Sequence, residues 1–201
     1  MPRPRFTLTF IAVFALGIAA ARADDVPPIP IPDGFVAQRL DVTKGWIARP
    51  KDWFYASHGV PGGWLWTISK EDSTKAEYET GMRIQMFVNV AKHGTTPQDL
   101  MQGFLKQKHD GTTVLSECSP TQAGTFVRQC LETLEPDTGH PGQNFHIQYS
   151  AFWPEKGDIA FLVTFGVPEG QWKETQSIAK VMSNLVIFGA DFGKDKDSKK
   201  E

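Results

Sequence analysis

MRIQMFVNVAKHGTTPQDLMQGFLKQK, residues 82–108, changes its hydrophobic period part-way along. Every second residue from Met82 to Val90 is apolar, which is typical of a strand with one buried face. Thr96 and Pro97 then have the residue types of a helix N-cap and a first helical position, and Asp99 stands where a capping acid is favoured. The stretch therefore predicts a strand over 82–90 and a helix over 97–108. The apolar stripe of this helix comprises Leu100, Met101, Phe104 and Leu105.

Alternation of apolar and polar residues also dominates the rest of the chain. It recurs in residues 145–153, and residues 159–167 are apolar at nearly every position, as in a strand covered on both faces. Shorter candidate strands are 35–40, 45–48, 64–69, 113–118, 125–134 and 185–188. A second helix is predicted over 169–184, with a buried face of Trp172, Ile178, Ala179, Met182 and Leu185. Two helices among hairpin-connected strands, without a βαβ rhythm, predict an α+β fold: an antiparallel sheet sandwiched by helices.

This order of elements resembles the PsbP-like superfamily, which includes DcrB-type bacterial envelope proteins. The similar features are an early strand that ends at a Pro-x-x-Trp turn (Pro50 to Trp53), the long strand that leads into helix 97–108, and a late Trp-containing helix followed by a short apolar strand. The resemblance implies an α-β-α sandwich without a shared catalytic centre, in proteins that mostly serve as binding or assembly factors. No residues of this chain match a metal, chloride or Ran site, so none is carried over.

The two ends of the chain differ in composition from the middle. Residues 1–23 have a basic start, an apolar run and an Ala-x-Ala ending at Ala23, which predicts a signal peptide; an uncleaved anchor is the alternative. Residues 24–33 are rich in proline and predict an extended spacer, and residues 193–201 are nearly all charged and predict a disordered tail. A single domain is expected over 34–192, and the mature protein is expected to be periplasmic or secreted.

The charge of the chain excludes some classes of partner. The whole chain has 21 Lys and Arg against 23 Asp and Glu. The signal peptide carries three of the arginines and no acid, so the mature chain has 18 basic residues against the same 23 acidic ones, a net charge of −5. A mildly acidic protein lacks the basic surface that nucleic acid or anionic lipid requires. We expect neither nucleic-acid binding nor a stable membrane anchor.

The two cysteines, Cys118 and Cys130, predict a disulfide. An even number of cysteines in an exported chain favours a bridge over two buried free thiols. Residues directly opposite each other on antiparallel strands lie within disulfide range. If 118 faces 130, then 122 faces 126 and Gly124 lies at the tip of the hairpin. A redox-active pair is not expected, because the C-x-x-C spacing is missing.

Aromatic residues gather in residues 46–66, where four of the six tryptophans lie. Between them, residues 58–63 read HGVPGG and predict a turn-rich loop. One interpretation is a binding lip, because Trp and Tyr combine a large contact area with a polar group. The other is packing in the core, which is the commoner role of such rings. The candidate binding residues are Trp46, Trp53, Tyr55, His58, Trp64 and Trp66.

The sequence contains no catalytic or phosphate-binding signature and no zinc-ligand spacing, so neither catalytic residues nor a metal or other cofactor are expected. The first hypothesis is an exported binding or assembly factor that meets a protein partner in the bacterial envelope. The alternatives are a periplasmic hydrolase and a small-ligand or glycan binder that uses exposed tryptophans. The hydrolase would use His58, Asp137, His140 and His146, of which the last three could also approach a metal ion.

Overall fold

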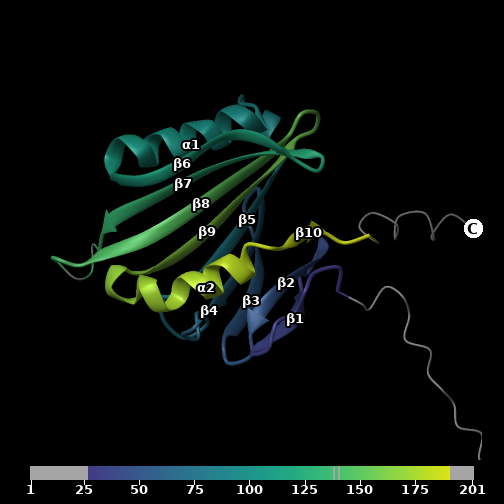
Figure 1. Cartoon of the computed structure of the whole chain (residues 1–201). Coiled ribbons are helices and arrows are strands. Elements are labelled where there is room, and N and C mark those ends of the chain that lie inside the picture. The colour runs from purple at the N-terminus through teal and green to yellow at the C-terminus, as the bar shows by residue number, and fades with distance from the viewer. Residues whose placement is uncertain (1–26, 138, 140, 191–201) are drawn as a thin grey trace, which may run out of the picture.

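The computed structural model describes residues 27–137, 139 and 141–190 and contains two antiparallel sheets and two α-helices (Figure 1). The larger sheet has the order β3-β4-β5-β9-β8-β7-β6 and the smaller sheet the order β1-β2-β10. The strands are β1 Phe35–Arg39, β2 Lys44–Pro50, β3 Phe54–Val60, β4 Gly63–Ser69, β5 Gly81–Val88, β6 Thr113–Ala123, β7 Phe126–Pro136, β8 Asn144–Pro154, β9 Ile159–Pro168 and β10 Val186–Phe188. The helices are α1 Pro97–Gly111 and α2 Trp172–Met182, with short 3-10 turns η2 Val90–His93 and η3 Glu169–Gln171.

Strand β9 separates two hydrophobic cores, because its alternate side chains point to opposite faces of the larger sheet. Ala160 and Leu162 pack in the core beneath α1, whereas Phe161 and Val163 pack in the core on the side of α2 and the smaller sheet. The strand is therefore covered on both faces, as its continuous apolar sequence predicts.

The two helices lie on opposite sides of the larger sheet (Figure 1). Helix α1 begins as predicted: the Thr96 hydroxyl oxygen accepts the Asp99 N–H at 3.0 Å, and Met101 and Leu105 are buried against the sheet. Helix α2 packs on β9 and also on β2. The α+β class and the antiparallel sheet are thus confirmed. The second face is covered by α2 together with the three-stranded sheet rather than by a helix alone.

Two local predictions were wrong. Residues 58–60 belong to strand β3, and the turn is confined to the link between Val60 and Gly63, where Gly62 has a φ of 76°. Pairing with β4 imposes the extended form on a segment whose composition favours turns. The strand predicted over 82–90 also ends earlier than expected. Strand β5 stops at Val88 and Val90 begins η2, because Asn89 adopts a left-handed φ of 56°.

A disulfide joins Cys118 of β6 to Cys130 of β7, with their Cα atoms 5.1 Å apart, which confirms the predicted pairing. Gly124 lies in the hairpin turn with a φ of 64°. The predicted register beyond the disulfide was wrong, because residue 126 faces Ala123. One extra residue of β6 is accommodated between Cys118 and Thr121, next to Pro120, which has no N–H to give to a ladder.

The predicted signal peptide and charged tail lie outside the described residues, as does the start of the proline-rich segment. Within the rest of that segment, Ile29 is buried. None of the helices in residues 27–190 that the structure describes is long and apolar enough to cross a membrane.

Candidate functional site

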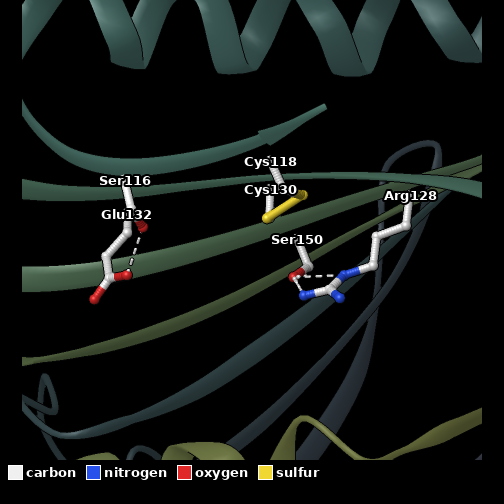
Figure 2. The surroundings of a disulfide bond; sticks show 6 residues. All are labelled: Ser116, Cys118, Arg128, Cys130, Glu132 and Ser150. Atoms are coloured by element: carbon white, nitrogen blue, oxygen red, sulfur yellow. Dashed lines mark hydrogen bonds between the residues drawn. A yellow bond between two sulfur atoms is a disulfide. The ribbon is translucent and has the colours of Figure 1, made fainter. Parts of the chain in front are cut away.

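A groove of about 340 Å³ lies between α2 and the face of β6–β8 that points away from α1. We call it the α2 groove. Figure 2 shows its floor, where Arg128, Cys130 and Glu132 point from β7 to the same side. They do so because residues two apart on a strand share a face. The neighbouring strands bring Ser116 and Ser150 beside them.

The cationic end of the floor is formed by Arg128. Its Nε and Nη2 atoms donate hydrogen bonds to Ser150 Oγ at 3.3 and 3.0 Å (Figure 2). Because a hydroxyl group is neutral, this contact positions the guanidinium group without neutralising its charge. Among the residues that the structure describes, Arg128 has no carboxylate partner.

The anionic end of the floor is formed by Glu132, whose two carboxylate oxygens are both occupied. Ser116 Oγ donates to Oε2 at 2.8 Å, and His146 Nε2 lies in hydrogen-bond contact with Oε1. Burial raises the pKa of the Glu132 carboxyl, but the hydrogen bonds with His146 and Ser116 outweigh it and hold the pKa below its ordinary value. Glu132 is therefore a paired, ionised carboxylate.

The histidine of this network is fixed by α2. The His146 ring is 6% exposed and stacks on the Trp172 ring with 3.8 Å between the ring centroids. The stack ties strand β8 to the first turn of α2, so it sets the distance across the groove. Further along the helix, Gln176, Lys180 and Ser183 form an exposed wall.

This arrangement is poorly suited to nucleophilic catalysis. In a serine hydrolase a histidine takes the proton of the serine hydroxyl. Here the Ser116 hydroxyl donates to Glu132, whose lowered pKa makes it a weak base, and His146 contacts the other oxygen of the same carboxylate.

The structure separates the six aromatic-segment residues that the sequence singles out. Trp53 and Trp66 are buried, at 5% and 0% exposure, and belong to the core on the α2 side. Trp46, Tyr55 and Trp64 are half-buried, and His58 is exposed. Trp46 lies beneath Arg39, Tyr55 donates to Asp41, and Trp64 packs against the core. Two of the six are thus core residues, and the others do not share one surface.

The structure does not bring together the residues that the alternative hydrolase hypothesis would use. His58 lines a cleft on the α1 side of the larger sheet, whereas His146 points to the α2 side. The Asp137 carboxylate accepts the Gly139 N–H at 2.7 Å within its own turn, and His140 lies outside the described residues. Over the described ranges, no three His, Cys, Asp or Glu side chains are grouped so as to hold a metal ion.

Comparisons with known proteins find similarity in structure only. No protein-family model and no curated protein matches the sequence. A solved structure from Bacteroides thetaiotaomicron is 17% identical over 74% of this chain with a TM-score of 0.43, and the chain spans only 47% of that protein. Cyanobacterial PsbP (CyanoP) from Synechocystis sp. PCC 6803 is 12% identical, covers 77% of this chain and 93% of its own, and has a TM-score of 0.47.

The Saccharomyces cerevisiae Ran-binding protein Mog1p is also 12% identical, covers 79% of this chain and 97% of its own, and has a TM-score of 0.47. With identities below 25% and TM-scores below 0.5, these similarities transfer neither a family, an activity nor a partner to this chain.

Sequence reasoning missed the α2 groove. A signal was present in residues 126–136, where Arg128, Cys130 and Glu132 alternate with less polar neighbours. The alternation marks a polar strand face, but nothing in the sequence says that α2 lies across from it.

Proposed function

We propose that the protein is an exported, non-catalytic binding or accessory factor that holds a segment of a protein partner in the α2 groove. The observation that carries the proposal is the floor of the groove, where Arg128 and Glu132 are held in place by hydrogen bonds to neighbouring strands. Polar groups fixed before binding lose little entropy when a partner arrives, which favours recognition.

The charges of the groove favour an acidic partner segment. Glu132 is already paired with His146, whereas Arg128 and the exposed Lys180 have no carboxylate partner among the described residues. Two cationic side chains against the one carboxylate of Glu132 give the lining of the groove a net positive charge. A carboxylate side chain of the partner would accept hydrogen bonds from the guanidinium group of Arg128.

Export is supported by the signal-like start of the sequence and by the disulfide between β6 and β7. Disulfides persist in oxidising compartments and are rare in the cytosol. We place the protein in the bacterial envelope or outside the cell, where its partner would be another exported protein.

The experiment is in-cell crosslinking of the tagged chain in its native host, followed by mass spectrometry. Lys180→Glu reverses a charge in the groove, and Lys173→Glu makes the same change on α2 outside the groove lining. We expect a reproducible partner whose yield falls at least about tenfold with Lys180→Glu and is unchanged with Lys173→Glu. Equal yields from both variants would place the interaction elsewhere.

Two further assays address the alternatives. Turnover of ester, phosphate or glycoside substrates that is lost with His58→Ala or His146→Ala would favour the hydrolase. A shift of tryptophan fluorescence on adding a panel of sugars would favour the glycan binder.

A further inference from the structure

A second and larger cleft, of about 830 Å³, lies on the α1 side of the larger sheet. Helix α1 packs over β7, β8 and β9 and leaves this part of the same face uncovered. Strands β3, β4, β5, β8 and β9 contribute to the floor, and the segment that links β4 to β5 forms a roof. We call it the Arg83 cleft. Its volume is in the range of small-molecule sites.

Three hydrogen-bond donors stand side by side on the floor. Arg83 of β5 is directly opposite Thr67 of β4 on one side and Thr164 of β9 on the other. Directly opposite residues on neighbouring strands share a face and lie about 5 Å apart. The three side chains thus form one row across the sheet, and all three line the cleft.

The side-chain donors of this row make no hydrogen bond within the residues that the structure describes. Thr67 is only 6% exposed, yet its hydroxyl makes no hydrogen bond to any residue in the described part of the chain. Within the same residues, Arg83 and Thr164 form no hydrogen bond and no ion pair. Arg83 is exposed and the Thr67 oxygen is not fully buried, so both groups open onto the cleft. An unpaired hydroxyl beside an unpaired guanidinium group in a cleft is the arrangement expected where a ligand supplies the acceptor.

In the next row of the floor, neither β5 nor β9 carries a side chain. Gly81 of β5 is directly opposite Gly166 of β9. A Cβ atom at Gly81 would lie 2.5 Å from the Ile68 carbonyl oxygen, so packing requires this glycine. A Cβ atom at Gly166 would meet only a side-chain carbon of Ile147, at 3.9 Å, so packing does not require the second glycine. Its effect is to leave the floor open beside Arg83.

The surroundings of this opening are apolar and ordered. Leu65, Phe145 and Ile147 contribute apolar surface to the lining. The roof is fixed by the Glu71 carboxylate, which accepts the N–H groups of residues 79 and 80 at 3.2 and 3.1 Å. Tyr78 of the roof is partly buried; burial raises its pKa and outweighs the nearby Arg83, so its phenol stays neutral and can donate.

The charges of the rim restrict the ligand further. Glu77 and Glu79 are exposed and line the cleft beside the roof. Two carboxylates repel a multiply charged anion, such as a phosphate dianion, more strongly than a monoanion.

We propose that the Arg83 cleft binds a small monocarboxylate with an apolar body. The carboxylate lies on the row of Thr67, Arg83 and Thr164, where Arg83 can donate two parallel hydrogen bonds. The apolar body lies over Gly166 and extends toward Phe145 and Ile147. This site is separate from the α2 groove and does not depend on its function.

The test is calorimetric titration of the mature protein with decanoate, with decanol as the uncharged probe of equal chain length. We expect decanoate to bind at least about tenfold more tightly than decanol, because only the acid engages Arg83. Equal binding of the two probes, or no binding of decanoate, overturns the proposal.

Two variants test the two halves of the site. Arg83→Gln removes the charge, and Gly166→Leu fills the opening; each is expected to weaken decanoate binding at least about tenfold. The matched controls are Lys173→Gln, at an exposed cation outside both cavities, and Gly103→Leu on the exposed side of α1, where a Cβ atom meets nothing within 4 Å. The controls should bind decanoate as the native protein does.

Thermal unfolding confirms that each variant is folded before it is titrated. Should Gly166→Leu not fold, Gly166→Ala with Thr67→Val tests the same surface with smaller changes. Unchanged decanoate binding in Arg83→Gln and in a folded Gly166 variant would overturn the proposal.

Discussion

The α2 groove and the Arg83 cleft differ in whether their polar side chains are hydrogen-bonded to neighbouring residues. In the groove, Arg128 is bound to Ser150 and Glu132 to both Ser116 and His146. In the cleft, Thr67 and Arg83 form no hydrogen bond within the part of the chain that the structure describes. The hydrogen-bonded groups of the groove are held by neighbouring strands, whereas the donors of the cleft open to solvent and are available to a ligand. Changes in the groove should therefore reduce stability, and changes in the cleft should reduce ligand binding.

The largest effect is expected from the disulfide beside the groove floor. Replacing both cysteines, Cys118→Ala with Cys130→Ala, should lower the free energy of unfolding by about 3 kcal/mol, because a short loop of the unfolded chain is no longer closed. Urea unfolding of the variant measures this loss. Adding a reductant to the native protein should reproduce it, and a native protein unaffected by the reductant would argue against the bridge.

The next effect concerns the stack that fixes the width of the groove. His146→Ala removes the ring that packs on Trp172 and leaves Glu132 without one of its hydrogen bonds. We expect a loss of about 2 kcal/mol. His58→Ala, a change at an exposed histidine of the cleft, is the control and should lie within about 0.5 kcal/mol of the native protein.

A smaller effect is predicted for the pH dependence of stability. The pKa of Glu132 is lowered below its ordinary value of 4.5 in the folded protein. Its contribution is therefore present above about pH 4.5 and is lost as the pH falls through the folded pKa. Glu132→Gln should lose less stability than the native protein on acidification. Glu117→Gln, at an exposed carboxylate of β6, should follow the native curve.

The smallest effect on stability is expected from a comparison of two threonines, one whose hydroxyl is hydrogen-bonded and one whose hydroxyl is not. Thr67→Val should leave stability unchanged or raise it by about 0.5 kcal/mol, because it removes a hydroxyl that makes no hydrogen bond within the described residues and valine favours strands. Thr133→Val, at a buried threonine whose hydroxyl donates to Glu135 at 3.1 Å, should instead cost about 1 kcal/mol. Thermal unfolding of both variants compares them, and a destabilised Thr67→Val would show that this hydroxyl has a partner.

Much of the fold could be predicted from local sequence patterns. The strand over 82–88 and helix α1 follow from alternation and from the capping residues Thr96 and Pro97, which act within a few residues of the chain. Strand β3 could not be predicted in the same way. Its Gly59 and the following Pro61 favour a turn, and only the partner strand β4 holds residues 58–60 extended.

The disulfide hairpin, the aromatic segment and the two concave sites were harder to predict than the fold, because they depend more strongly on tertiary contacts. The facing cysteines could be predicted, but the extra residue beside Pro120 could not, because a bulge leaves no period in the sequence. The aromatic segment left a binding lip and core packing open, and the register of β4 directs Trp66 into the core. Both concave sites bring together strands that are distant along the chain, such as β5 and β9 for Arg83 and Thr164.

The irregularities of β6 also bear on self-association. This strand is at the edge of the larger sheet, where its outer N–H and C=O groups could pair with another copy of the chain. Register shifts occur between Val114 and Ser116 and again between Cys118 and Thr121. The regular stretch between them is only Ser116 to Cys118, which is too short to seed intermolecular strand pairing. The bulges thus protect an otherwise long and exposed edge against aggregation.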